Sequence, residues 1–274
     1  MPKVQSLDLC EPTTGTAERD YLSFSAVSTF QSCPLRYYFR YIRNLPEECV
    51  AASLVFGSSI HAAVQMHFEQ LLAGFEAPDL ATLLTVFQDA WQSHATIPVL
   101  FGKRDDFDAY CRMADRTLRA FQGSQWAHPS GTIIAVEEEL RGAVVPGCPD
   151  ILGRVDLLVD AGDELVLTDF KTSRSGWSAD HVVDAAPQLL LYSELAQPLT
   201  DGMPLRLQFA VMTKTQTPDF TLHSVRNNPE QVCRTKRIIQ RVWQAIQART
   251  YYPNPSPINC PTCPYRAACR TWQG

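Results

Sequence analysis

The sequence lacks the features that would connect it to a membrane or to export. It contains no run of about 18 apolar residues, the length that a membrane-spanning helix needs. Its first 14 residues hold no apolar core of the kind that a secretory signal carries. We therefore expect a cytoplasmic protein with no membrane partner.

Two further absences limit the possible functions. The chain has no Gly-x-x-x-x-Gly-Lys-Ser/Thr loop, the phosphate-binding motif of ATP-driven motors, so any helicase must be another protein. A strong excess of charge of one sign is also missing, because the chain has 24 Lys and Arg and 29 Asp and Glu, for a net charge of −5. That balance argues against a general nucleic-acid coat protein. It leaves room for an acidic metal site beside a local basic channel.

The sequence does contain an ordinary globular composition over 274 residues, 45% of them hydrophobic. The order strand-strand-strand-helix-strand, with helices outside it, indicates an α/β core wrapped by helical segments. We expect one compact domain in four parts, which are a flexible lead-in (1–20), a helical part (21–131), a core (132–249) and a cysteine-rich tail (250–274).

Hydrophobic periodicity predicts the bounds of the main elements. Helices are predicted at residues 35–44, 53–73, 79–94 and 105–122, and we interpret the last two as a helical insertion or cap. Strands are predicted at residues 132–140, 151–159, 164–170, 205–212 and 220–225, with helices at 181–197 and 230–249.

Two carboxylates and a lysine in the predicted sheet indicate metal-assisted chemistry. Asp169 and Lys171 are two residues apart on one predicted strand, so their side chains share a face. Asp156 lies near the middle of the preceding strand, and pairing of the two strands can bring it beside Asp169. Close carboxylates repel each other unless a divalent cation lies between them, and oxygen ligands suit Mg²⁺ or Mn²⁺. With a lysine to orient water, the set suits hydrolysis of a phosphodiester.

Four short motifs follow one another along the chain. They are Gly57-Ser58-Ser59-Ile60-His61, Gly153-Arg154-Val155-Asp156, Asp169-Phe170-Lys171-Thr172 and Gln188-Leu189-Leu190-Leu191-Tyr192. Each is weak alone, but together and in this order they resemble the PD-(D/E)XK nuclease superfamily, and within it the RecB-like branch. The resemblance spans residues 22–269. It implies a restriction-endonuclease-like core, which is a mixed central sheet flanked by helices.

The resemblance also implies a role for each motif residue. The implied ligands of Mg²⁺ or Mn²⁺ are His61, Asp156, Asp169 and the carbonyl of Phe170. Gly57 stands one turn before His61 and leaves space beside the imidazole. Lys171 would position or activate water, and Gln188 and Tyr192 would hold DNA or the lysine. The implied activity is an exonuclease that acts on single-stranded DNA or duplex ends in repair, recombination or CRISPR-type defence.

Two choices of residue depend on the register of the predicted hairpin. Pro149-Asp150 spells the literal Pro-Asp of the family, yet Asp150 precedes the predicted strand, whereas Asp156 lies within it after Gly-Arg-Val. We favour Asp156. The family often has a supporting glutamate before the hairpin, and the sequence does not choose among Glu137, Glu138 and Glu139.

Four of the nine cysteines form a pattern. Cys260, Cys263 and Cys269 lie close together in the tail, and Cys33, over two hundred residues earlier, is a candidate fourth ligand. Four thiolates serve zinc or an iron–sulfur cluster. The spacing resembles the cluster-bearing nucleases of CRISPR adaptation and of the AddAB type, which implies a [4Fe–4S] cluster that staples the two ends of the chain.

Arginines beside Cys33 give the predicted nuclease a candidate DNA contact. Arg36, Arg40 and Arg43 occupy one face of the predicted helix at 35–44, so a cluster could anchor a DNA-binding element. Two other functions stay open at this point. One is a non-cleaving module that uses the same fold to hold DNA or a protein. The other is a nuclease subunit that acts only with a partner such as a helicase or an integrase-type protein.

Overall fold

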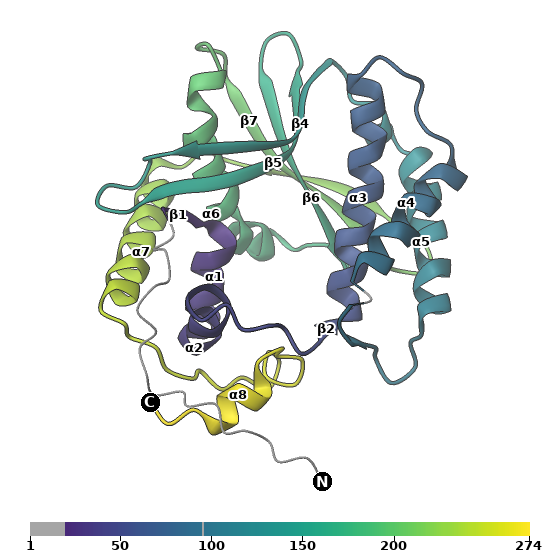
Figure 1. Ribbon diagram of the computed structural model, residues 1–274. Coiled ribbons are helices and arrows are strands. Elements are labelled where there is room, and N and C mark those ends of the chain that lie inside the picture. Colours follow the sequence, from purple (N-terminus) through teal and green to yellow (C-terminus); the bar gives the residue numbers. More distant parts are fainter. Residues whose placement is uncertain (1–19, 95) are drawn as a thin grey trace.

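The computed structural model describes residues 20–94 and 96–274, so Cys10 and most of the predicted lead-in lie outside the described residues. A six-stranded mixed sheet lies between two layers of helices (Figure 1). The first half of the chain contains β1 (Tyr21–Ser23), α1 (Phe24–Ser32), α2 (Pro34–Tyr37), the π-helix η1 (Tyr38–Ile42), β2 (Val50–Ala51), α3 (Ala52–Leu72), α4 (Leu80–Ser93), β3 (Val99–Leu100), α5 (Phe107–Gln122) and η2 (Gln125–Ala127). The second half contains β4 (Thr132–Gly142), β5 (Asp150–Asp160), β6 (Leu165–Ser173), α6 (Ala179–Ala196), η3 (Gln197–Leu199), β7 (Leu205–Thr213), β8 (Phe220–Val225), α7 (Pro229–Gln247) and α8 (Arg266–Thr271).

The sheet forks beside β5, and this fork positions the site described below. Along one edge of β5, β4 pairs from Ile151 to Asp160 in antiparallel register. The opposite edge is shared, because β1 pairs in parallel with residues 150–152 and β6 pairs antiparallel with residues 157–160. Within the described part of the chain, residues 153–156 therefore have no strand partner on that edge, and β5 and β6 separate at Asp156.

Each face of the sheet is covered by its own helical layer. α3, α4 and α5 pack on one face, where Phe56, Phe87 and Phe121 are fully buried. α1, α6 and α7 cover the other face, where Leu189 of α6 is fully buried. Successive side chains of β6 point to opposite faces of the sheet. Leu167 packs with α1, α6 and α7, and Val166 packs with α3, α4 and α5. The helices expected as an insertion or cap, α4 and α5, are thus part of the main core.

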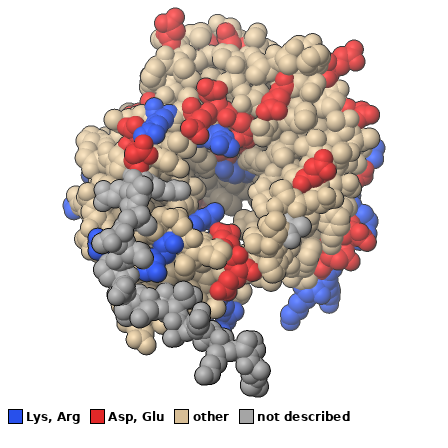
Figure 2. Space-filling model, viewed as in Figure 1, with Lys and Arg blue, Asp and Glu red and all other residues tan. Residues whose placement is uncertain are grey.

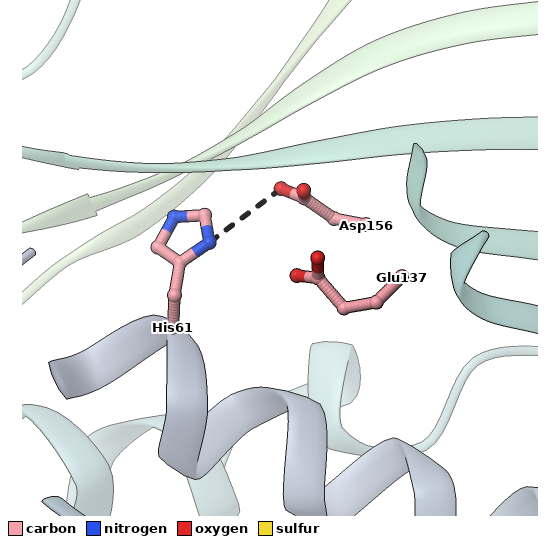
Figure 3. A group of neighbouring side chains, drawn as sticks. All are labelled: His61, Glu137 and Asp156. Atoms are coloured by element: carbon pink, nitrogen blue, oxygen red, sulfur yellow. Dashed lines mark ion pairs between the residues drawn. The ribbon is translucent and has the colours of Figure 1, made fainter. Parts of the chain in front are cut away.

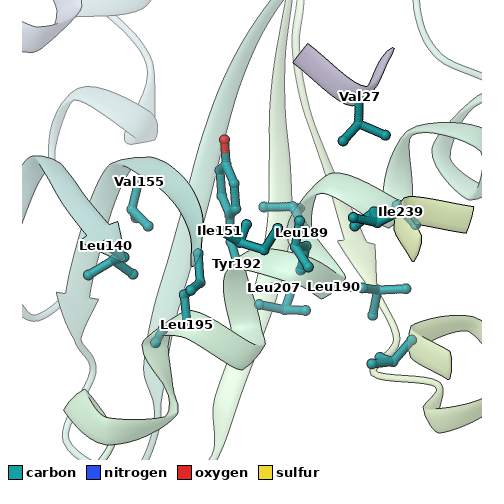
Figure 4. Packing of buried hydrophobic residues seen from close by; sticks show 14 of the residues in the cluster. Val27, Leu140, Ile151, Val155, Leu189, Leu190, Tyr192, Leu195, Leu207 and Ile239 are labelled. Carbon is teal, nitrogen blue, oxygen red and sulfur yellow. The ribbon is translucent and has the colours of Figure 1, made fainter. Parts of the chain in front are cut away.

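α6 lies against the unpaired edge of β5. A Cβ at Gly153 would come within 2.6 Å of the Tyr192 ring, so this glycine lets the ring pack directly on the strand. Figure 4 shows the ring of Tyr192 among apolar side chains with its hydroxyl pointing out of the cluster. Pro187 inside α6 lacks an N–H, and the carbonyl of Val183 one turn earlier accepts from Gln231 of α7 instead.

Most elements match the sequence-based expectations, and the exceptions have local causes. The α/β core with a mixed sheet flanked by helices is confirmed. The very short strands β1, β2 and β3 were not predicted, because two or three residues carry no period. The segment predicted as a helix at 35–44 is helical over residues 34–42, but its second half is the π-helix η1. Among the described residues, no helix has both the length and the apolar character to cross a bilayer.

Replacing Gly153 by alanine should destabilise the protein. Overpacking against the Tyr192 ring should cost about 1–3 kcal/mol, and each kcal/mol corresponds to roughly 2–4 °C in Tm for a chain of this size. Scanning calorimetry of Gly153→Ala and of the control Gly176→Ala measures this, since no atom lies within 4 Å of a Cβ built at Gly176. An equal change in both variants would contradict the packing argument.

Candidate active site

Three metal-ligand side chains converge where β5 and β6 separate. His61 of α3, Glu137 of β4 and Asp156 of β5 each offer a ligand atom, and these atoms all lie within 4.8 Å of one another. His61 Nδ1 is 3.8 Å from Asp156 Oδ2. Figure 3 shows the imidazole and both carboxylates pointing toward one another from three separate elements. A nitrogen and carboxylate oxygens form a donor set that suits Mg²⁺ or Mn²⁺.

A close approach of α3 to β6 places His61. A Cβ at Gly57, one turn before His61, would lie 3.3 Å from Thr172 Oγ1 at the end of β6. Gly57 therefore makes room for Thr172. We expected the space beside Gly57 to lie next to the imidazole, but in the structure Thr172 occupies it.

The hairpin register brings Glu137 opposite Asp156. Both lie between the register pairs Val136↔Leu157 and Glu138↔Val155. Glu137 has a φ of 52°, a left-handed conformation that costs a non-glycine residue on the order of 1–3 kcal/mol. The structure thus selects one glutamate from the three that the sequence left open, because Glu138 and Glu139 are exposed.

The strands change face at the same point. Val155 and Leu157 are two residues apart and should share a face, yet Val155 packs in the cluster with α6 and Leu157 in the cluster with α3. Asp156 lies between them, and its Oδ2 accepts a 2.6 Å hydrogen bond from the N–H of Phe170. The change of face and this bond direct the carboxylate into the site.

A second group of side chains adjoins the first. Asp169 is 2% exposed, and its Oδ1 accepts a 2.9 Å hydrogen bond from Gln188 Nε2. Lys171 Nζ forms a 2.6 Å ion pair with Asp169 Oδ2 and donates to Gln188 Oε1 at 3.1 Å. Gln188 also donates to the hydroxyl of Tyr192 at 3.2 Å. Gln188 and Tyr192 therefore hold the lysine and Asp169, which is one of the two roles expected for them.

Asp169 has an incompletely satisfied oxygen. The approach of Lys171 to Oδ2 is not aligned as a hydrogen bond, so this buried oxygen has no hydrogen-bond donor among the described residues. Asp169 is absent from the three-residue ligand group, and its oxygens contact Lys171 and Gln188. Metal ligation by Asp169 and by the Phe170 carbonyl stays a prediction. The unsatisfied oxygen and the adjacent carboxylates fit a cation bound here.

Burial and mutual repulsion govern the protonation of the carboxylates. Burial, and then the nearby charge of Asp169, raise the pKa of Asp156 well above its ordinary value of 3.8. Burial also raises the pKa of Glu137, although Arg154 opposes it. Burial lowers the pKa of His61, which favours the neutral imidazole that a metal needs. The carboxylates are therefore held close together without enough positive charge to balance them.

Lys171 stays charged in this setting. Burial acts to lower its pKa, but the negative charge of Asp169, whose Oδ2 lies 2.6 Å from the ammonium, outweighs burial with a contribution from Asp156 and raises it. A protonated lysine beside the ligand group can orient a water molecule or stabilise negative charge on a phosphate.

Most of the sequence matches one family. The family model of the PD-(D/E)XK nuclease superfamily matches residues 21–270. The chain belongs to this superfamily. Nucleases of this superfamily use divalent metals, in agreement with the His61, Glu137 and Asp156 group.

A solved structure shares the fold of this PD-(D/E)XK chain. A protein from Eubacterium rectale, described as “Putative exonuclease”, is similar with a TM-score of 0.57 at 14% identity, over 93% of this chain and 89% of that one. The structure of SSO0001 overlaps over 89% of this chain and 94% of that one at 12% identity, but its TM-score of 0.36 is too low to show a shared fold. No curated protein matches the chain.

The alternative aspartate, Asp150, is engaged elsewhere. It stands at the first residue of β5, where its Oδ2 accepts a 2.9 Å hydrogen bond from Arg141 Nε. The same arginine pairs with Asp20 at 2.8 Å. Asp150 therefore contributes to an exposed ion-pair network and is absent from the ligand group.

The three predicted DNA-binding arginines do not form one free stripe. Because the chain changes from α2 to η1 at Tyr38, the spacing of a regular α-helix is lost. Arg40 pairs with Glu47 at 3.6 Å and Arg43 donates to the Tyr38 hydroxyl at 3.4 Å, while the buried Nε of Arg36 has no hydrogen-bond partner among the described residues. Binding of DNA by these arginines stays a prediction.

The C-terminal tail packs against the segment around Cys33, where α8 lies near α2 in Figure 1. Cys33, Cys263 and Cys269 border a small buried cluster that includes Tyr265. Burial raises the pKa of the Cys263 and Cys269 thiols, and neighbouring cysteines add to the rise. The backbone N–H of Asn254 points at Cys33 Sγ from 3.5 Å.

Sequence reasoning missed one basic residue of the site. A cavity of about 560 Å³ extends from the ligand group along α3, and Lys214, just after β7, lines it together with Lys171. A lone lysine after a strand is an ordinary surface residue in the sequence. Only the pairing of β6 with β7 shows that it shares a groove with the ligand group.

Asp156→Asn should stabilise the metal-free protein at neutral pH. The folded state holds the Asp156 proton more tightly than the unfolded chain does, so ionisation of this carboxyl increasingly destabilises the fold as pH rises above 3.8. Asparagine keeps an acceptor for the Phe170 N–H. Thermal melts in a chelator should show a higher Tm for the variant, by about 2–4 °C for each kcal/mol relieved, and the gain should shrink toward about pH 4.

The matched control for that melt is Asp150→Asn, which removes a carboxylate from an exposed ion pair with Arg141. It should leave Tm unchanged or slightly lower. A lower Tm for Asp156→Asn at neutral pH would show that the carboxylate stabilises the metal-free fold, against the argument from repulsion.

Proposed function

We propose that the protein is a metal-dependent deoxyribonuclease that acts as an exonuclease on single-stranded DNA or on duplex ends. One observation carries the proposal. The ligand group of His61, Glu137 and Asp156 adjoins the Asp169–Lys171 pair at one end of an open groove. The description of the Eubacterium rectale protein supports the choice of an exonuclease.

The residues of the site divide the work of hydrolysis. His61, Glu137 and Asp156 would hold the metal, with Asp169 and the Phe170 carbonyl next to them. A bound Mg²⁺ or Mn²⁺ supplies Lewis-acid stabilisation of charge on the phosphate. Lys171 orients the attacking water, and Gln188 fixes the lysine through its Oε1. Gln188 in turn is oriented by its bonds to Asp169 and Tyr192.

A non-cleaving module has no use for this arrangement. A protein that only binds DNA gains nothing from a buried carboxylate such as Asp169, since negative charge repels phosphate. Carboxylates held together against their repulsion are typical of sites that bind a cation for catalysis.

Substitutions at the site should abolish cleavage. Asp156→Ala, Asp169→Ala and Lys171→Ala should each lower the rate by about a hundredfold or more, since losing one preorganised electrostatic group of an active site costs about 10²–10³-fold. His61→Ala should weaken metal binding by at least about tenfold. The assay uses end-labelled linear and circular single strands, with Mn²⁺ or with chelator.

Asp150→Ala is the control for these variants and should keep its activity, because its partner is Arg141 outside the groove. Loss of activity in Asp150→Ala but not in Asp156→Ala would reverse our assignment. Cleavage of the circular strand at the rate of the linear one would identify an endonuclease.

We also propose that Cys33, Cys260, Cys263 and Cys269 bind a [4Fe–4S] cluster. Cys33, Cys263 and Cys269 pack against the small hydrophobic core that includes Tyr265. The spacing of Cys33 and the tail cysteines, which resembles that of cluster-bearing nucleases, supports the cluster over a single zinc. The reduced thiols of the cytoplasm favour the same ligands.

Elemental analysis tests the cluster directly. Protein purified without oxygen should contain about four irons per chain, and Cys33→Ser should lose iron and melt at a lower temperature because the joined ends are released. Cys233→Ser is the control and should keep the metal, since Cys233 is exposed on α7. One zinc and no iron would refute the cluster, and full iron in Cys33→Ser would refute its role as a ligand.

A further inference from the structure

The groove has an acidic end and a basic end. At the acidic end lie Glu137 and Asp156, and the groove then follows α3 past Gly57 to Ser53, where Lys214 lines it. Figure 2 shows this face of the molecule hollowed near its centre, with basic side chains inside the hollow and acidic ones at its rim. Positive charge is thus concentrated inside a hollow on the surface of a protein whose net charge is −5.

The ammonium of Lys214 has no anionic partner. It lies 5.6 Å from the centroid of the Phe56 ring, and no described carboxylate forms an ion pair with it. Burial lowers the pKa of Lys214, and the positive charge of Arg174 lowers it further. Lys171, in the same groove, differs because it pairs with Asp169. A half-buried cation that lacks a counter-charge is costly, and an anion from outside would offset that cost.

The position of Lys214 suits a phosphate other than the one that is cleaved. Phe56, beneath the ammonium, precedes His61 by five residues, about 7.5 Å along α3. Successive phosphates of a strand lie about 3.4 Å apart along the axis of B-DNA, and further apart in an extended strand. If the substrate strand runs along α3 with its scissile phosphate at the ligand group, the next phosphate or two would come within reach of Lys214.

We propose that Lys214 is a substrate-binding residue that contacts a non-bridging oxygen of a phosphate one or two nucleotides from the scissile bond. The proposal rests on the proposed nuclease function. Lys214 would help to set the direction in which the strand enters the groove, because the end of the groove at Lys214 attracts phosphate and the other end holds the metal.

The first test measures binding without cleavage. Lys214→Met keeps the apolar stem over Phe56 and removes the charge, and Lys214→Arg restores a charge. The control Lys236→Met removes an ammonium that pairs with Glu194 outside the groove. Binding of labelled oligothymidylate in chelator is measured at several salt concentrations. Lys214→Met should bind about tenfold more weakly at low salt, and its log–log salt slope should fall by about 0.7.

A structural role would give a different result. If Lys214 only covers Phe56, then Lys214→Met, which keeps the apolar stem, should leave both Tm and the salt slope unchanged, and an unchanged slope would overturn the proposal. The proposal expects near-normal Tm, a rescued slope in Lys214→Arg and an unchanged slope in Lys236→Met. In Mn²⁺, it expects Lys214→Met to raise KM with little change in kcat.

A neutral linkage in the substrate identifies the phosphate. Oligothymidylates that each carry one methylphosphonate are compared with wild type and Lys214→Met. At one or two positions the neutral linkage should weaken wild-type binding but leave Lys214→Met unaffected, since both changes remove the same contact. Equal losses for both proteins at every position would overturn the proposal. Wild-type protein that shows no metal-dependent cleavage would instead refute the proposed function, so the two failures are distinguishable.

Discussion

The bond between the Asp156 carboxylate and the N–H of Phe170 is the interaction on which the site depends. It spans the gap where β5 and β6 separate, at 2.6 Å, and it fixes the one carboxylate that faces both His61 and Glu137. The open edge of β5 beside it receives the Tyr192 ring over Gly153. One fork in the sheet therefore provides space for the ligand group and a seat for the helix that carries Gln188.

The electrostatics of the site oppose folding and favour ligand binding. Buried carboxylates and a half-buried, unpaired lysine stand in one groove, where neither finds a full counter-charge within the described chain. Stability is supplied elsewhere, by two apolar helical layers on a six-stranded sheet. A cation would relieve the first imbalance and a phosphate the second, which is the pair of charges that a nuclease substrate complex brings together.

The segment around Cys33 and the C-terminal tail form a separate small hydrophobic core beside this fold. Backbone bonds from Leu35 to Tyr252 and from Glu48 to Pro264 already connect the two ends. The cysteines lie at the border of that core, so a bound cluster would strengthen an existing contact between residues far apart in sequence. Arg36 of α2 and Arg40 of η1 lie beside this small core, and Arg40 forms an ion pair with Glu47.

The sequence by itself determined the α/β class and most of the longer helices and strands, because these depend on local period. Residue chemistry at fixed spacing predicted the motif residues His61, Asp156, Asp169 and Lys171. The sequence did not determine which glutamate faces Asp156, nor the change from α-helix to π-helix at Tyr38. Only the tertiary structure decided these points and placed Lys214 in the groove. The reason is that hairpin register, a left-handed residue at 137 and the pairing of β6 with β7 are set by contacts between distant segments, which no local pattern encodes.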